Sequence, residues 1–247
     1  MNVEITDLTR RFGRTMAVAG VDLRAGPGVF GLLGPNGAGK TSLLRMMATA
    51  IPPTSGTLRL LGHDPARYGP RREIRRRLAY LPQSLGYYPG FTVAESVEYF
   101  ALLKEVPPAR IPAAVAAAIE RVALGGKARA RLRTLSGGMV RRAGIAQAIV
   151  NEPELLLLDE PTAGLDPEQR MAFRALLRDL GQHATVVVST HLVEDVGAAC
   201  TQVGLMDRGK IVFHGTPEGL TARGEGHGTG DAPLERGYSA VLSAARS

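Results

Sequence analysis

The sequence predicts an α/β protein with a mainly parallel β-sheet and an inserted helical lobe. Segments with the pattern of strands alternate with segments of helical periodicity, which is typical of a parallel sheet covered by helices. The apolar runs at residues 155–158 and 185–188 are almost uninterrupted, as expected for strands that are buried on both faces. Between about residues 84 and 135 the chain becomes rich in alanine at helical spacing, and this stretch is the predicted lobe.

The first third of the chain contains most of the predicted strands. Residues 3–23 have a strand-like pattern that is broken by the turn-forming residues 25–28, and residues 29–33 form an apolar run that predicts a buried strand. A glycine-rich loop follows, and apolar residues at helical spacing then predict a helix over residues 41–47. Two further strands are predicted at residues 57–60 and 78–81.

Helix starts in the remainder of the chain are indicated by capping residues. Thr92 and Glu95 have the spacing of a capping box, and Asp166 before Pro167 predicts an N-cap with proline in the first turn. The glycine-rich residues 223–230 predict a flexible linker, after which apolar residues between 234 and 242 predict a short amphipathic helix. We therefore divide the chain into a main domain at residues 1–215 and a C-terminal extension at residues 216–247.

Composition and charge narrow the class of protein. With 247 residues, 45% of them hydrophobic, the chain can bury a sizeable core. Its apolar runs are far shorter than the roughly 20 residues that cross a bilayer, its first residues lack the features of a signal peptide, and its single cysteine, Cys200, fits a reducing compartment. We therefore expect a cytosolic chain.

The formal charge of +7 comes almost entirely from arginine. The densest basic run, residues 71–77, has no aromatic residue among its charges, so we expect no nucleic-acid partner.

A phosphate-binding P-loop follows the strand at residues 29–33 and precedes the helix at 41–47. The loop matches the pattern GxxxxGK(S/T). Its glycines let backbone N–H groups face phosphates, Lys40 adds a positive charge, and the Thr41 hydroxyl suits Mg²⁺. The residues predicted to bind the nucleotide here are Gly34, Pro35, Asn36, Gly37, Ala38, Gly39, Lys40, Thr41 and Ser42.

Two carboxylates, Asp159 and Glu160, end the apolar run at residues 155–158. Charges at the end of a buried strand are costly without a cation or polar partner. We expect Asp159 to join the Mg²⁺ shell and Glu160 to orient or deprotonate the attacking water, because phosphoryl transfer depends mainly on positioning and charge stabilisation.

The segment Leu135-Ser136-Gly137-Gly138-Met139 resembles the LSGGQ signature of ABC-family nucleotide-binding domains. The resemblance covers about residues 1–215 and implies a P-loop NTPase core, an antiparallel β subdomain and a helical lobe. It also implies that Phe12 stacks on adenine, that Gln83 reaches Mg²⁺ and senses a membrane partner, that Asp166 belongs to the D-loop, and that His191 contacts the γ-phosphate.

The signature resemblance further implies a second copy of the cassette. Ser136, Gly137 and Gly138 precede a helical stretch and suit phosphate binding. In the resembled family they close over ATP held by the P-loop of the other chain, in a head-to-tail homodimer or pseudo-dimer. Met139 replaces the usual glutamine, which removes a polar side chain near the dimer interface while the residues that face the phosphate remain.

The resemblance implies an ATP-hydrolysing subunit at the cytoplasmic face of the membrane, working with a separate integral membrane permease. Residues 86–89 and the tail at 234–242 resemble exporter-type ATPases, so export is the expected direction. The alternative is a non-transport ABC ATPase that acts on nucleic acid or the ribosome. Such proteins carry long coiled coils or two cassettes, and this sequence has neither a long heptad tract nor a repeated P-loop.

Overall fold

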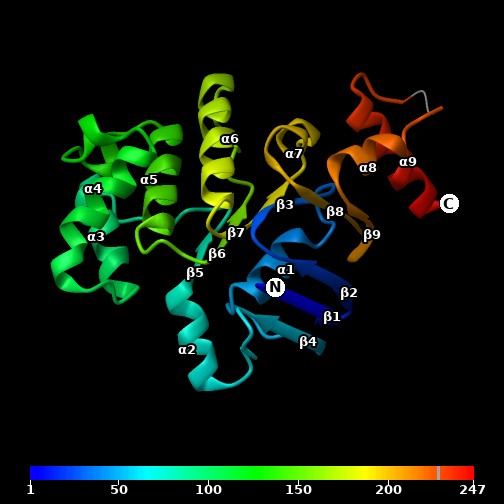
Figure 1. The fold of residues 1–247 in the computed structure, drawn as a ribbon, viewed down its shortest axis with the longest axis horizontal. Coiled ribbons are helices and arrows are strands. Elements are labelled where there is room, and N and C mark those ends of the chain that lie inside the picture. The colour runs from blue at the N-terminus through cyan, green and yellow to red at the C-terminus, as the bar shows by residue number, and fades with distance from the viewer. Residues whose placement is uncertain (227–228) are drawn as a thin grey trace.

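The computed structural model describes residues 1–226 and 229–247 and confirms the α/β prediction. Residues 227 and 228 belong to the glycine-rich linker predicted for 223–230, and that part of the prediction lies outside the described residues. The strands of the described chain form two sheets. Helices pack between the two sheets, on the other face of the larger sheet, and at both ends of the molecule (Figure 1).

The larger sheet of the described residues has six strands in the order β5-β6-β7-β3-β8-β9. All neighbouring pairs are parallel except β8 and β9, which are antiparallel. The crossovers place β3 at the centre, between β7 and β8. The strands are β3 (Gly28–Leu33), β5 (Leu78–Leu81), β6 (Leu155–Asp159), β7 (Thr185–Thr190), β8 (Gln202–Asp207) and β9 (Lys210–Gly215).

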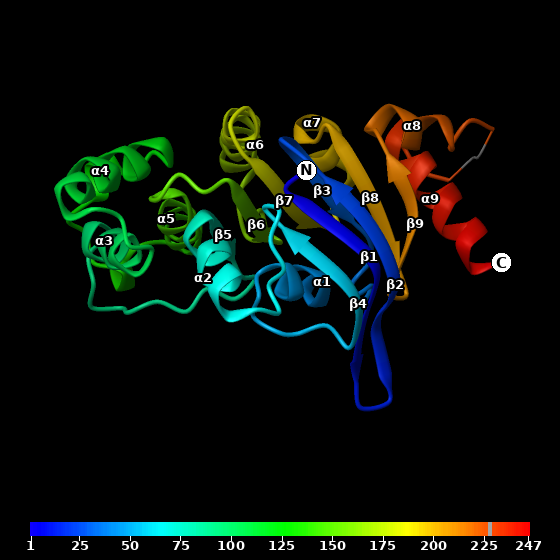
Figure 2. The same cartoon turned by 60° about the horizontal axis from the view of Figure 1, so that its bottom comes forward.

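The smaller sheet is antiparallel, in the order β2-β1-β4. Its strands are β1 (Val3–Phe12), β2 (Thr15–Ala25) and β4 (Ser55–Leu60). β1 and β2 form a hairpin whose turn contains Gly13 at a positive φ of 55°, and Figure 2 shows this hairpin projecting from the body of the molecule. This sheet is the antiparallel subdomain that the family resemblance implied.

Helices pack against both faces of the larger sheet. α1 lies between the two sheets, where it contacts β6, β7 and β2, whereas α6 and α7 contact β3 and β7. α2 precedes β5 and carries the basic run at residues 71–77; Ile74 is its buried residue. These helices are α1 (Lys40–Met47), α2 (Tyr68–Arg77), α6 (Pro167–Gly181) and α7 (Val193–Ala199).

A helical lobe forms one end of the molecule (Figures 1 and 2). α3 begins with the predicted capping box: Thr92 Oγ1 accepts from Glu95 N, and the Glu95 carboxylate accepts from Thr92 N. α5 packs against α3, α4 and β5, so it joins the lobe to the larger sheet. The lobe helices are α3 (Val93–Leu103), α4 (Ile111–Arg121) and α5 (Gly137–Ile149), with short 3₁₀ turns at Pro108–Arg110, Gly125–Lys127 and Leu132–Thr134.

The core divides into layers because the central strands are buried on both faces. Leu155 and Leu157 of β6 pack with α1 and the smaller sheet. Leu156 and Leu158 point to the opposite face and pack with α6 and the helical lobe. This alternation within a continuous apolar run is the arrangement that the sequence predicted for strands covered on both sides.

The C-terminal extension contributes two helices at the end opposite the lobe (Figure 1). α8 (Pro217–Ala222) was not predicted, whereas α9 (Pro233–Arg246) confirms the predicted amphipathic tail helix. Leu234, Tyr238, Val241 and Leu242 pack against a cluster formed with β8 and α7. Among the described residues, no helix has the length and apolar character needed to cross a bilayer.

Candidate phosphate-binding and catalytic site

The P-loop runs from the carboxyl end of β3 to the N-terminus of α1 and is pressed against two other strands. Gly34 has a φ of 156° and Gly39 a φ of 105°, both of which favour glycine. A Cβ atom on Gly34 would lie 2.2 Å from the carbonyl oxygen of Met206, and one on Gly39 would lie 2.2 Å from that of Ala17. Backbone contacts therefore require glycine at these two positions of the predicted loop.

Lys40 is the first residue of α1, and its side chain is buried above the loop. Its Nζ donates to the carbonyl oxygens of Gly34 at 2.6 Å and Pro35 at 3.1 Å, and it lies 3.5 Å from Oε1 of Glu160. Burial lowers the pKa of Lys40, while the neighbouring Glu160 opposes that shift. The loop and the acidic end of β6 thus share one ammonium group.

Asp159 lies at the end of β6 and accepts two hydrogen bonds on one oxygen. Thr41 Oγ1 donates to Asp159 Oδ1 at 3.2 Å, and Ser189 Oγ donates to the same oxygen at 2.7 Å. The Tyr80 hydroxyl lies 3.5 Å from Asp159 Oδ2, and burial together with the Asp159 charge raises the pKa of Tyr80. The Thr41 hydroxyl and the Asp159 carboxylate are hard oxygen donors of the kind that Mg²⁺ uses when it also binds phosphates, so this pair fits the ion.

Glu160 follows directly and has a left-handed backbone, with a φ of 48°. Its backbone N–H donates to the Ser189 side chain at 3.0 Å and to the Ser189 carbonyl at 3.2 Å. Nδ1 of His191 lies 2.9 Å from Glu160 Oε2. Because an ionised carboxylate only accepts hydrogen bonds, His191 donates from this nitrogen. The buried Glu160 carboxylate is therefore held between the Lys40 ammonium and the His191 ring.

The other predicted P-loop residues complete the loop around Lys40. Asn36 and Gly37 are exposed, Ala38 is buried, and Ser42 is half-buried in the first turn of α1. The Ala38 carbonyl accepts from Gly209 N at 2.9 Å. The turn between β8 and β9 therefore supports the loop from below.

Phe12, Gln83 and Asp166 lie outside this hydrogen-bonded group. Phe12 ends β1 and is 45% exposed, with the Arg10 guanidinium 4.4 Å from its ring centroid. Gln83 is exposed just after β5. Asp166 is the predicted N-cap of α6 and accepts from Gln169 N at 2.8 Å.

The signature segment forms the start of α5. Ser136 is the N-cap, and its Oγ accepts from Met139 N at 3.3 Å. Gly137 and Gly138 are the first helical residues, and Met139 packs against the apolar cluster of the lobe. Among the hydrogen bonds of the described residues, none joins the signature to the P-loop of the same chain.

Two residues of the site were missed from the sequence. Ser189 follows the apolar run of β7, and its position two residues before His191 was the signal that could have indicated it. Arg141 of α5 is buried and donates to backbone carbonyls beside Asp159 and Glu160. In a chain so rich in arginine, no local pattern distinguishes it.

The family match and the similar proteins agree on one family for this chain. The sequence profile of a family described as "ABC transporter" matches residues 19–163. A protein named "Nod factor export ATP-binding protein I" from Paraburkholderia xenovorans is 37% identical over 222 residues, which cover 89% of this chain and 72% of the relative. A protein of the same name from Rhizobium etli is 34% identical over 221 residues, covering 88% and 69%.

Solved structures share the fold. One described as the ATP-binding subunit of an ABC transporter superposes with a TM-score of 0.86 at 22% identity, covering 98% of this chain and all of that one. The cbiO1 protein of Clostridium perfringens, described as part of the transporter complex cbiONQ, has a TM-score of 0.80 at 26% identity, with 89% and 90% covered.

Proposed function

The chain belongs to the ABC transporter family, and on that premise we propose that it powers export through a separate membrane permease, from the cytoplasmic face of the membrane. It is the ATP-binding and ATP-hydrolysing subunit of such a transporter. The proposed mechanism rests on one observation: the side chains of Lys40 and His191 both contact the Glu160 carboxylate beside the P-loop. The export direction is supported by relatives whose printed names are those of export ATPases.

In the proposed mechanism the P-loop amides and Lys40 hold the phosphates of ATP, and Phe12 contacts the adenine. Thr41 and Asp159 hold Mg²⁺, with Gln83 as a further ligand. When bound, the ion neutralises phosphate charge. Glu160 accepts the proton of the attacking water, and the hydrogen bond from His191 fixes the direction of its carboxylate.

We propose that the signature of one chain acts on the nucleotide that is bound by a second copy of the chain. The N-terminus of α5 presents Ser136 and two glycines, which suit a phosphate. Within one described chain the signature makes no hydrogen bond with the P-loop. A head-to-tail dimer would bring the signature of one copy over the nucleotide of the other, with Asp166 near the shared interface.

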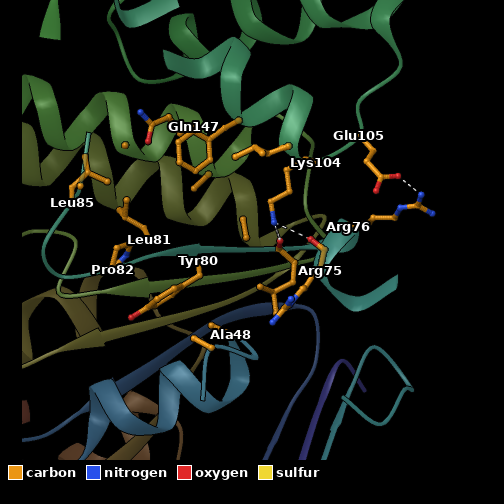
Figure 3. A pocket seen from close by; sticks show the side chains of 18 of the residues that line it. Ala48, Arg75, Arg76, Tyr80, Leu81, Pro82, Leu85, Lys104, Glu105 and Gln147 are labelled. Carbon is orange, nitrogen blue, oxygen red and sulfur yellow. Dashed lines mark hydrogen bonds and ion pairs between the residues drawn. The ribbon is translucent and has the colours of Figure 1, made fainter. Parts of the chain in front are cut away.

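We place the permease contact at the groove between α2, β5 and the helical lobe. This cavity measures about 620 Å³ and lies against Tyr80, Leu81 and Pro82, directly before Gln83 (Figure 3). Its walls include apolar side chains from α3 and α5, such as those of Phe100, Leu103 and Ala148, together with the backbone of Gly144. A permease segment seated here would lie next to the chain that leads to Gln83.

The rim of the groove is basic. Lys104 Nζ donates to the carbonyl oxygens of Arg75 at 2.9 Å and Leu78 at 2.5 Å, and burial lowers its pKa to about 8. The residues that line the groove include four basic side chains and one acidic side chain, Glu105, so the groove has a net positive charge even though Glu105 is paired with Arg72 and Arg76. The charges therefore favour an occupant that combines apolar residues with at least one carboxylate, such as a short cytoplasmic segment of the permease.

Purification and cross-linking test this function together. The tagged protein would be isolated from its native membranes in mild detergent, and we expect a multi-span membrane protein to co-elute without an extracellular binding protein. In a Cys200→Ser chain, Leu103→Cys in the groove should cross-link to that protein, whereas Leu102→Cys, which is equally exposed but outside the groove, should not. Ribosomal or DNA-bound partners in place of a membrane protein would overturn the transport assignment, and equal cross-linking at both positions would overturn the docking site.

A further inference from the structure

The side chain of Arg141 uses every one of its donors on backbone carbonyls. Nε donates to Pro161 O at 3.2 Å, Nη1 donates to Pro82 O at 2.8 Å and Gln83 O at 3.0 Å, and Nη2 donates to Asp159 O at 2.7 Å and Glu160 O at 2.9 Å. These five bonds equal the donor capacity of a guanidinium group.

Arg141 is also deeply buried, with 7% of its surface exposed. Burying a charge is costly unless the group is fully hydrogen-bonded. Among the described residues Arg141 forms no ion pair at contact distance, so carbonyl oxygens provide its nearest partners. The charges of Asp159 and Glu160 partly offset the burial, which lowers the pKa of the guanidinium.

The five carbonyls come from two loops that the proposed mechanism uses. Pro82 and Gln83 follow β5; Pro82 lines the proposed permease groove, and Gln83 is the next residue. Asp159 ends β6, and Glu160, the proposed base, and Pro161 follow it. Arg141 itself lies on α5, the helix that begins with the signature. One planar group therefore connects three segments whose roles differ.

The Glu160 backbone is fixed from both sides by these contacts. Its N–H is held by Ser189 of β7, and its carbonyl is held by Arg141 of α5. Between these two bonds the residue keeps a left-handed φ of 48°, a conformation that costs free energy for a residue with a side chain. The same carbonyl also accepts from Ala163 N at 3.3 Å, within its own loop, so the shorter bond from Arg141 is what ties this peptide to α5.

We propose that Arg141 is a positioning residue for ATP hydrolysis, which holds the backbone of Glu160 and of Gln83 in one geometry and so makes the direction of the Glu160 carboxylate depend on the position of α5. This inference rests on the proposed role of Glu160 as the base. A shift of α5 would move the guanidinium and with it both loops.

The chain offers a matched control beside Arg141. Arg142 lies on the same helix but donates to the carbonyls of Val122 and Ala123, both at 3.3 Å, within the helical lobe. Arg141→Met should lower the kcat of the purified full chain about 10- to 100-fold, the scale expected for a misplaced catalytic group. The KM for ATP should change less than about threefold, because the P-loop is untouched. Arg142→Met should leave both values unchanged.

Arg141→Lys provides a second variant for the case in which Arg141→Met does not fold. Lysine keeps the charge but has three donors at one point, so it cannot span both loops. We expect its melting temperature and ATP affinity to stay near those of the parent chain, and its kcat to fall between those of the parent and Arg141→Met.

A double-mutant cycle separates positioning from general stability. In a Glu160→Gln chain the base is already absent, so adding Arg141→Met should cost less than about threefold in residual turnover. Equal losses in both backgrounds, or an equal loss in Arg142→Met, would overturn the inference. If Glu160→Gln alone leaves turnover unchanged, the proposed base is wrong; if it cuts turnover while Arg141→Met does not, only the positioning role is wrong.

Discussion

At the scale of single residues, the site is a set of short-range charge contacts around one buried carboxylate. Glu160 faces Lys40 at 3.5 Å and His191 at 2.9 Å. Lys40 also binds two carbonyls of the P-loop, whereas Glu160 contacts no P-loop backbone among the described hydrogen bonds. These contacts support the proposal that Lys40 acts in phosphate binding and Glu160 in turnover.

Substitution of these two residues should separate binding from catalysis. Lys40→Ala should weaken ATP binding itself, because it removes the charge at the loop. Glu160→Gln should leave ATP affinity nearly unchanged and cut kcat by roughly two to three decades, the usual scale for losing a general base. Fluorescent nucleotide titration and phosphate release measure the two quantities. Equal loss of affinity in both variants would contradict this separation.

At the scale of elements, α3, α5 and α6 begin at side-chain caps, two of which the sequence predicts. Asp166 caps α6, Ser136 caps α5, and Thr92 and Glu95 form the box at the start of α3. α2 contains the run of arginines at residues 71–77, for which the sequence predicts no helix. It starts without a side-chain cap and ends where its backbone turns into β5, so tertiary contact rather than a local signal determines its limits.

The capping box of α3 provides a test of stability alone. Thr92→Ala should lower the free energy of unfolding by about 1 kcal/mol, the typical cost of losing an N-cap. ATPase activity should not change, because α3 holds none of the proposed catalytic residues. Urea unfolding measures the difference. Glu98→Ala, on the same helix and without a described side-chain hydrogen bond, is the control and should be nearly neutral. Matching losses in both variants would refute the capping role.

At the scale of the whole molecule, the C-terminal helix is tied to the strand that supports the P-loop. Arg246 of α9 donates to both oxygens of Asp207, at 3.0 Å and 2.8 Å. Met206, the preceding residue, has its carbonyl against Gly34. The tail helix therefore packs on the same strand end that shapes the phosphate loop, although it lies at the far end from the helical lobe (Figure 1).

The ion pair between Arg246 and Asp207 should make stability depend on pH. The Arg246 guanidinium lowers the pKa of Asp207 below its ordinary value, so the pair stabilises the folded state above the unfolded pKa of about 4 and is lost as pH falls through the folded pKa. Arg246→Ala should lower the Tm at pH 7 and have a shrinking effect below about pH 4. Thermal unfolding across this range provides the measurement.

A second variant isolates the carboxylate in this pair. In an Asp207→Asn chain, Arg246→Ala should add no pH-dependent change in Tm, because position 207 no longer titrates. An undiminished effect of Arg246→Ala at pH 3 would mean that α9 is held by its apolar face and not by the ion pair.

The sequence could predict the parts of the fold and the site that depend on neighbours in the chain. The P-loop, the acidic pair after residues 155–158 and the two predicted caps are local patterns, and the structure has the corresponding elements. In each case the residues that create the feature lie within one turn or one strand. The physical cause, such as an N-cap hydrogen bond or a glycine at positive φ, acts over the same short distance.

The pairing of strands is decided at longer range. Residues 57–60 alternate between polar and apolar side chains and residues 78–81 form an apolar run, but neither pattern identifies the neighbouring strand: β4 pairs with β1 in the antiparallel sheet and β5 pairs with β6 in the parallel one. A strand's own pattern specifies its buried face but not its hydrogen-bonding partner. The family resemblance supplied the antiparallel subdomain, which the pattern alone could not.

The spacing of residues along the chain is enough to indicate an ATPase cassette with a lysine, a hydroxyl, two carboxylates and a histidine. Which of these groups contact one another depends on the fold. Ser189 bonds to Asp159 across 30 residues, and Arg141 bonds to Pro82 across 59. These contacts arise because parallel strands bring their carboxyl ends to one edge of the sheet and α5 packs beside it. The carbonyl partners of a buried arginine cannot be predicted from a sequence pattern, because every residue has the same backbone oxygen.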